Sequence, residues 1–376
     1  MASAVFKRID WLLLIFILPI VVAGLLTMKS FAPGEGAGDF FTRQLVWLTI
    51  SLAVFFIFSF IDFRFLKRTD VLIGIFSLFS VILLLLFVVG HVAHGAKAWF
   101  NLGLFSFQPV DMMKLVLVLI LSKYFSRRHV EIRDTKHIFI SGLYTLIPLI
   151  LVLLQPDFGS AMILLCIWLG MVLVSGISKT HLLVVFATGA MVFILLWSFA
   201  FAPYQKARIM NFLNPLSDIH GSGYNAFQST IAVGSGELTG KGLGFGTQSR
   251  LRFLPEPETD FVFAAFAEEW GFIGSLLLLI LYLLVISRIL YTASYGATNF
   301  EILFGMGIAI FLMSHILINV GMNVGLLPIT GIPLPFMSYG GSHLLTEFMG
   351  LGILSSMRRY SRSIHRDDMK REFLGI

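Results

Sequence analysis

Residues 71–90 read VLIGIFSLFSVILLLLFVVG, an apolar run without a single charged side chain. A helix that crosses the hydrocarbon core of a bilayer needs about 20 mostly apolar residues, and this run supplies them. Similar runs recur along the 376-residue chain, which is 57% hydrophobic and only 13% charged, whereas ordinary globular chains carry about 25% charged residues. The sequence therefore predicts an all-α polytopic membrane protein and excludes a soluble one.

The apolar runs predict about ten transmembrane helices. The first is read as a signal anchor, because no small-residue cleavage site precedes a soluble domain. The predicted spans are Trp11–Met28, Leu45–Ile61, Val71–Gly90, Pro109–Phe125, Ile138–Leu154, Phe158–Ser175, His181–Ala202, Phe272–Tyr291, Ile302–Val324 and Ser342–Met357.

The loops between the spans differ in charge. With the N-terminus placed inside, two-thirds of the 27 Lys and Arg residues fall in inside loops and tails. Cytoplasmic loops carry such an excess, so both termini are predicted to lie in the cytoplasm and the chain in the cytoplasmic membrane. The same loops, lying near anionic lipid, account for the net charge of +6 without a nucleic-acid partner.

Residues 203–260 form one long loop on the outer side, between the seventh and eighth predicted spans. The loop mixes aromatic residues with charges of both signs, which is unlike a disordered tether. We expect a folded cap on a single membrane-embedded domain that takes up residues 1–376.

The middle of this loop is rich in glycine, from Gly234 to Gly246. A nucleotide-binding P-loop is excluded, because Gly236 and Gly240 enclose only three residues and Gly242 follows Lys241. Either a flexible surface turn or a backbone that approaches a ligand closely remains open.

The loop ends in FLPEPETD, residues 253–260, where Glu256, Glu258 and Asp260 reach the membrane surface within five residues. Asp260 has two possible roles. It can cap the helix that follows, or it can act as a general base toward a lipid-linked substrate.

Other polar residues stand at membrane depth. Asp111 and Lys114 are three apart on one predicted helix and share a face, either as a structural ion pair or as a functional site. Residues 327–336 carry three prolines and no charge, which suits non-helical backbone buried in protein. The helix after Ser338 and Ser342 would point its N-terminus outward, where a phosphate could bind. Trp99 is either an interfacial belt residue or part of the site.

The single cysteine, Cys166, excludes an intramolecular disulfide, and the histidines lack zinc-binding spacing.

Three stretches resemble the SEDS family (shape, elongation, division and sporulation). They are GKGLGFGTQSRLRFLPEPETDF, GLLPITGIPLPFMSYGGS, and the pair FQPVDMMK and QPDFGSA. Gly246–Ser249 followed by Phe253–Glu256 is similar to the elongation branch, RodA. The sequence departs from the family pattern in Val110-Asp111, where Ser-Glu is usual, and in Ala98, where an arginine usually precedes the tryptophan.

The resemblance implies a peptidoglycan glycosyltransferase that polymerises lipid II during cell elongation, with ten spans and a site open to the outer face. Its implied partners are a class B penicillin-binding protein transpeptidase and other membrane proteins of the elongation complex. Asp260 matches the family's proposed general base, and a divalent cation such as Mg²⁺ or Mn²⁺ is a possible cofactor. The predicted site comprises Asp260 as catalytic residue and, around the substrate, Trp99, Gln108, Asp111, Lys114, Arg208, Lys241, Glu256, Thr259, Ser338 and Ser342.

Two other functions fit a polytopic membrane protein. A lipid II flippase or transporter would favour polar groups near the midplane and two related halves, whereas here acids gather at the outer surface and no internal repeat is evident. A non-catalytic scaffold would have no need of the carboxylate cluster.

The charge asymmetry of the loops makes a testable prediction of topology. Cysteines introduced at Ser217 and Ser363 should react with a membrane-impermeant reagent from opposite sides, Ser217 from outside. Labelling of both positions from one side would contradict the ten-span arrangement.

Overall fold

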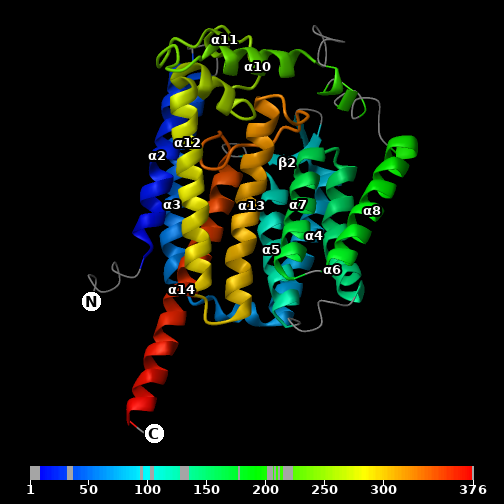
Figure 1. The fold of residues 1–376 in the computed structure, drawn as a ribbon, viewed down its shortest axis with the longest axis vertical. Helices are drawn as coiled ribbons and strands as arrows, with labels where there is room; N and C mark the ends of the chain where they lie inside the picture. The colour runs from blue at the N-terminus through cyan, green and yellow to red at the C-terminus, as the bar shows by residue number, and fades with distance from the viewer. Residues whose placement is uncertain are drawn as a thin grey trace.

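The computed structural model describes residues 9–31, 37–93, 96–101, 106–127, 135–176, 178–200, 206, 209–210, 212–214 and 223–374. Long helices run side by side as a bundle, and a shorter helical layer covers one end of it (Figure 1). The elements are α2 (Trp11–Ser30), α3 (Ala37–Phe60), η1 (Phe63–Lys67), α4 (Thr69–Val89), β1 (His91–Ala93), β2 (Ala96–Asn101), β3 (Ser106–Phe107), α5 (Pro109–Ser126), α6 (Thr135–Leu154), α7 (Phe158–Val174), α8 (Lys179–Leu195), η2 (Leu196–Ala200), α10 (Tyr224–Ser235), α11 (Thr247–Arg250), α12 (Val262–Ser294), α13 (Asn299–Asn323) and α14 (Gly341–Leu374).

Each predicted span lies inside a helix to within one residue at its ends, apart from His181–Ala202, which covers α8 and η2 and ends outside the described residues. The predicted all-α membrane fold is therefore confirmed. In the part of the chain that the structure describes, seven helices are long and apolar enough to cross a membrane by length and composition. The other three predicted spans correspond to α5, α7 and α14. Of these, α7 is apolar but shorter, with 17 residues.

A small antiparallel sheet of order β1-β2-β3 joins α4 to α5, and the sequence analysis did not foresee it. In its register Trp99 pairs with His91, and Phe100 pairs with Phe107. The sheet places Gln108 directly before α5, whose first residue is Pro109, a position that proline favours because its missing N–H is not needed there.

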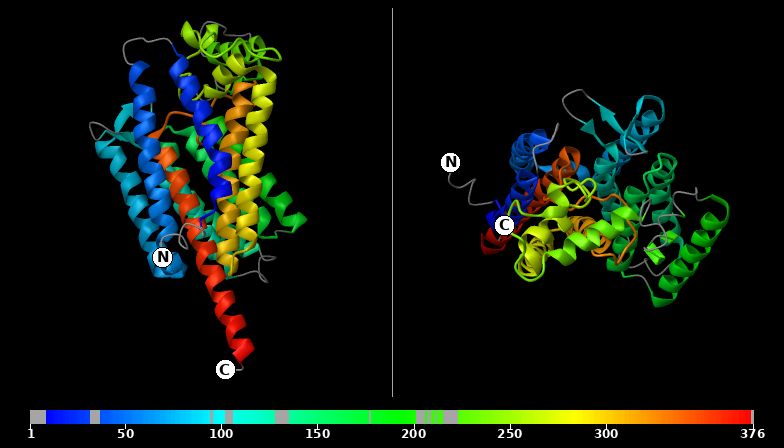
Figure 2. Two further views of the ribbon diagram at one scale, coloured as in Figure 1. Left: turned by 90° about the vertical axis from the view of Figure 1, so that its left-hand side faces the viewer. Right: turned by 90° about the horizontal axis from the view of Figure 1, so that it is seen from above.

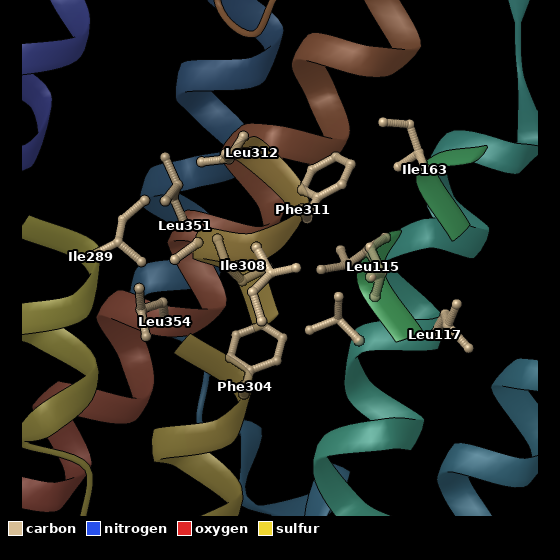
Figure 3. Packing of buried hydrophobic residues seen from close by; sticks show 14 of the residues in the cluster. Leu115, Leu117, Ile163, Ile289, Phe304, Ile308, Phe311, Leu312, Leu351 and Leu354 are labelled. Carbon is tan, nitrogen blue, oxygen red and sulfur yellow. The ribbon is translucent and has the colours of Figure 1, made fainter. Parts of the chain in front are cut away.

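Helix α13 lies at the centre of the bundle. In the apolar stretch of α13, 78% of the residues are buried, whereas none of the described side chains is buried in the apolar stretch Thr180–Phe199, which covers most of α8 and part of η2. Figure 3 shows Phe304 and Ile308 of α13 between Leu115 of α5 and Leu354 of α14. Side chains on α13 can therefore reach elements on opposite sides of it.

The two ends of the bundle differ. Figures 1 and 2 show α10 and α11 across one end, whereas α2 begins and α14 extends outward at the other end. At that second end, Asp10 accepts hydrogen bonds from Arg288 of α12 and from Arg358 of α14, which ties the start of α2 to both helices. The start of α2 and the end of α14 therefore lie at the same end of the molecule, away from α10 and α11.

Helix α12 begins earlier than predicted. The predicted span starts at Phe272, but the helix starts at Val262 and is broken at Gly271, where φ is 66° and ψ is −167°. The first segment, through Glu269, is buried in protein, so its two glutamates do not face lipid. Hydropathy did not predict this segment as part of the span, because it counts Glu268 and Glu269 as unfavourable charges. Their hydrogen-bond partners come from elsewhere in the chain and do not enter that count.

The glycine-rich loop supplies the hydrogen bonds that the break in α12 leaves unmade. Phe272 N donates to Glu237 O (2.9 Å), and Ile273 N donates to Leu238 O (3.1 Å). In return, Lys241 N donates to Glu268 O and Gly242 N to Glu269 O, each at 3.0 Å. The loop is thus fastened to α12, and the interpretation of these glycines as a flexible turn is wrong for this part of the chain.

Gly271 should tolerate no side chain. A Cβ there would lie 2.3 Å from Gly240 N, and its φ and ψ belong to a region used almost only by glycine, which costs other residues about 1–3 kcal/mol. We expect Gly271→Ala to lower the Tm in detergent by several degrees. Gly74→Ala is the matched control, because a Cβ at Gly74 meets nothing within 4 Å. Equal melting of the two variants would contradict this account.

Candidate functional site

Asp260 lies between the long loop and the buried start of α12. The N-cap of α12 is Phe261, so Asp260 stands one residue before the position that a capping aspartate would occupy. Its backbone carbonyl accepts hydrogen bonds from the side-chain amides of Asn319 and Asn323, both at 3.0 Å. Both asparagines are fully buried on α13. The central helix therefore fixes the backbone of Asp260.

The side chain of Asp260 faces Gly331. A Cβ placed on Gly331 would lie 3.3 Å from Asp260 Oδ2, and Gly331 has a φ of 71°, which favours glycine. Gly331 is exposed and Asp260 is half-buried. The carboxylate is thus held against the segment between α13 and α14, and the residue is not fully buried.

Thr259 and Ser338 meet beside Asp260. The hydroxyl of Ser338 donates to Thr259 O and accepts from Leu334 N (2.8 Å). One residue further on, Tyr339 N donates to Glu258 O (2.8 Å). The end of the long loop and the start of α14 are therefore joined through backbone groups, with Ser338 as the connecting side chain.

Of the other acids at the end of the loop, Glu256 is exposed and Glu258 is half-buried. Loss of solvation raises the pKa of the Glu258 carboxyl, and the charge of Glu256 raises it further. Glu256 holds the turn through its carbonyl, which accepts from Thr259 N (3.2 Å) and Phe261 N (3.3 Å).

Asp111 and Lys114 form a second group, between α5 and α14. Lys114 Nζ lies 3.0 Å from Asp111 Oδ1, and both side chains are almost fully buried. Ser342 Oγ donates to Asp111 Oδ2 (2.9 Å), which brings a third predicted residue to this group. The pair is therefore part of the protein interior, shared by two helices.

Lys241 lies in the cap. Its ammonium group is 2.7 Å from Glu268 Oε1 and donates to Thr247 Oγ1 (2.9 Å). Glu268 also accepts from the N–H groups of Thr247 (2.9 Å) and Gln248 (3.1 Å) at the start of α11. Lys241 thus balances a buried carboxylate that holds the loop.

Gln108 is the N-cap of α5, and its carbonyl accepts from Asp111 N (3.2 Å). The side chain of Gln108 donates to Asp157 Oδ2 (3.1 Å), while Asp157 Oδ1 accepts from Ser160 N and caps α7. Trp99 is half-buried in β2. Arg208 falls outside the described residues.

Sequence reasoning missed Gln44, Asn319, Asn323 and His343. Gln44 donates to Ser338 O (3.1 Å) and accepts from Gly340 N (3.3 Å). A signal for the asparagines was present, because two amides four residues apart share one face of an otherwise apolar span. Within the described residues, no three His, Cys, Asp or Glu side chains group so as to hold a metal ion.

A family model described as a cell cycle protein, covering FtsW, RodA and SpoVE, matches residues 6–363. The chain belongs to this family. The resemblance noted in the sequence is therefore confirmed, and the motifs that carried it contain Asp260, the Asp111–Lys114 pair and Ser338.

Individual relatives agree with this assignment. Peptidoglycan glycosyltransferase MrdB of Escherichia coli (strain K12) is 38% identical over 292 residues, which cover 77% of this chain and 79% of MrdB. A chain from a structure described as "Structural coordination of polymerization and crosslinking by a peptidoglycan synthase complex" has a TM-score of 0.80 at 32% identity and covers 94% of this chain and 98% of its own. Rod shape determining protein RodA of Thermus thermophilus has a TM-score of 0.69 at 30% identity and covers 93% and 97%.

Proposed function

We propose that this protein is a peptidoglycan glycosyltransferase that polymerises lipid II at the outer face of the cytoplasmic membrane during cell elongation. Membership of the FtsW, RodA and SpoVE family and the similarity to MrdB, itself named a peptidoglycan glycosyltransferase, support the activity. The observation that carries the site is the placement of Asp260, whose backbone is fixed by two buried asparagines while the residue as a whole is only half-buried.

In the proposed reaction, a sugar hydroxyl of one lipid-linked glycan attacks the anomeric carbon of another. The new glycosidic bond forms as the bond from that carbon to the pyrophosphate oxygen breaks, and undecaprenyl pyrophosphate leaves with the bonding electrons. Asp260 takes the hydroxyl proton as general base. Because its backbone is anchored to α13, the carboxylate would need little reorganisation to reach the hydroxyl.

The negative charge of the departing pyrophosphate calls for cations. Lys114 is the proposed ligand within the bundle, and Lys241 and Arg208 are proposed ligands from the cap. Lys114 is paired with Asp111 and Lys241 with Glu268, so each lysine would exchange a carboxylate for a phosphate. A divalent cation that arrives with the pyrophosphate would add to this positive charge.

We further propose that the cap faces the outside, that both termini are cytoplasmic, and that a class B penicillin-binding protein crosslinks the product. The start of α2 and the end of α14 lie at the same end, away from α10 and α11, which supports the orientation. The similar solved chain described as part of a peptidoglycan synthase complex supports the partnership. The other elongation-complex proteins remain an expectation from the family.

Asp260→Asn tests the base. The amide keeps the shape of the side chain and leaves the backbone bonds to Asn319 and Asn323 in place, but it cannot take a proton at working pH. We expect the variant to insert and bind lipid II almost normally, with polymerisation reduced about 10²–10⁴-fold. The measurement is glycan formation from lipid II by purified protein, alone and with the penicillin-binding partner.

Glu237→Gln is the matched control, because this carboxylate is exposed in the same cap. If Asp260→Asn polymerised lipid II at the rate of this control, Asp260 would not be the base, and Glu256 would become the next candidate.

Lys114→Met tests the pyrophosphate ligand. We expect polymerisation to fall by at least tenfold, since a hydrogen bond to a charged group contributes about 1.5–3 kcal/mol. The double variant Asp111→Asn with Lys114→Met removes both charges of the pair and should recover thermal stability without recovering activity. Recovery of activity in the double variant would show that the pair is only structural.

A further inference from the structure

His343 adds a charge to the group between α5 and α14. Its Nε2 lies 2.9 Å from Glu347 Oε1, and its Nδ1 lies 3.6 Å from Asp111 Oδ1. Neither ring nitrogen is aligned for a hydrogen bond, so a protonated His343 would interact with these two carboxylates through its charge. Glu347 and Asp111 are both almost fully buried.

Charge balance favours a protonated His343. Asp111 and Glu347 are two carboxylates, and Lys114 supplies one positive charge. Burial of uncompensated charge is costly, and an imidazolium at His343 makes the four groups neutral. His315 of α13 lies with its ring 4.5 Å away but faces a carbonyl, Pro333 O, at 3.2 Å, so it does not need to be charged.

Glu347 connects this group to the region of Asp260. Its Oε2 accepts a hydrogen bond from Phe336 N (3.1 Å), in the segment between α13 and α14. Phe336 has a φ of 61°, a conformation that is rare for an aromatic residue and needs support from its surroundings. The other side of the same segment holds Thr259 through Ser338. Glu347 thus accepts a hydrogen bond at Oε2, and its Oε1 lies beside His343 Nε2.

We propose that His343, anchored by Glu347, is a positioning residue that keeps Asp111 paired when Lys114 turns to the pyrophosphate of the substrate. This inference rests on the proposed function. Separating Lys114 from Asp111 costs free energy, because an unpaired buried carboxylate would remain. With His343 protonated beside it, Asp111 retains a cation and one hydrogen bond from Ser342. His343 therefore lowers the cost of releasing Lys114.

The deciding variant is His343→Gln combined with Glu347→Gln. It leaves Asp111 and Lys114 as a neutral pair and keeps an amide oxygen for Phe336 N. If His343 releases Lys114, this double variant should melt close to the wild type, but its KM for lipid II should rise about tenfold, because Lys114 stays with Asp111. A wild-type KM in the double variant would overturn the proposal.

A second comparison does not depend on the folding of the double variant. His343→Lys keeps a positive charge at this position, whereas His343→Gln removes it. We expect a KM near that of the wild type for His343→Lys and a raised KM for His343→Gln, each measured per folded molecule. An equal rise in both would mean that shape and not charge matters, and would overturn the proposal.

Controls separate this inference from the proposed function. His137→Gln removes another buried imidazole, one that contacts Tyr124 OH at 2.9 Å, and should leave KM unchanged. Asp260→Asn is run in the same assay. If the wild-type protein makes no glycan, the proposed function fails. If the wild type polymerises, Asp260→Asn does not, and the His343 variants keep a normal KM, only the present inference fails.

Discussion

The backbone between α13 and α14 is not helical, yet residues 334–338 are buried. Unpaired N–H and C=O groups inside a membrane bundle cost several kcal/mol each, so this segment needs partners from within the protein. Side chains supply many of them. Asn319 donates to Ile332 O (2.7 Å), Tyr282 donates to Pro335 O, and Glu347 accepts from Phe336 N. The arrangement of the site depends on these bonds, because Asp260 rests against this segment.

The same constraint explains which parts of the molecule could be predicted from sequence. Spans such as Val71–Gly90 can be predicted from sequence, because their backbone hydrogen bonds are internal to the helix. Apolar side chains are then enough to place the helix in the membrane. The proline run at 327–336 could be placed as buried non-helical backbone. Its partners could not be foreseen, since Gln44 and Tyr282 are far away in sequence and nothing local marks them as partners of Ser338 or Pro335.

The glycine-rich loop shows why a motif alone was ambiguous. Free N–H groups at the start of a helix, a threonine hydroxyl and a lysine are the groups that bind phosphate in nucleotide sites. Here all three converge on the carboxylate of Glu268. A buried glutamate therefore occupies the place of an anionic ligand. Sequence reasoning named Lys241 as an anion ligand, but it did not name Thr247 and could not know that the anion belongs to the chain.

Both predicted lysine ligands consequently have a carboxylate partner before any substrate arrives. Lys114 is paired with Asp111 and Lys241 with Glu268, because burial demands it. A pyrophosphate has to compete with these carboxylates, so its affinity is the difference between two strong interactions. That affinity also depends on which hydrogen-bond and charge partners remain for the released carboxylate. Glu268 keeps the N–H groups of α11, and Asp111 keeps Ser342 and the nearby His343. Removing those remaining partners would weaken substrate binding even though none of them needs to touch the substrate.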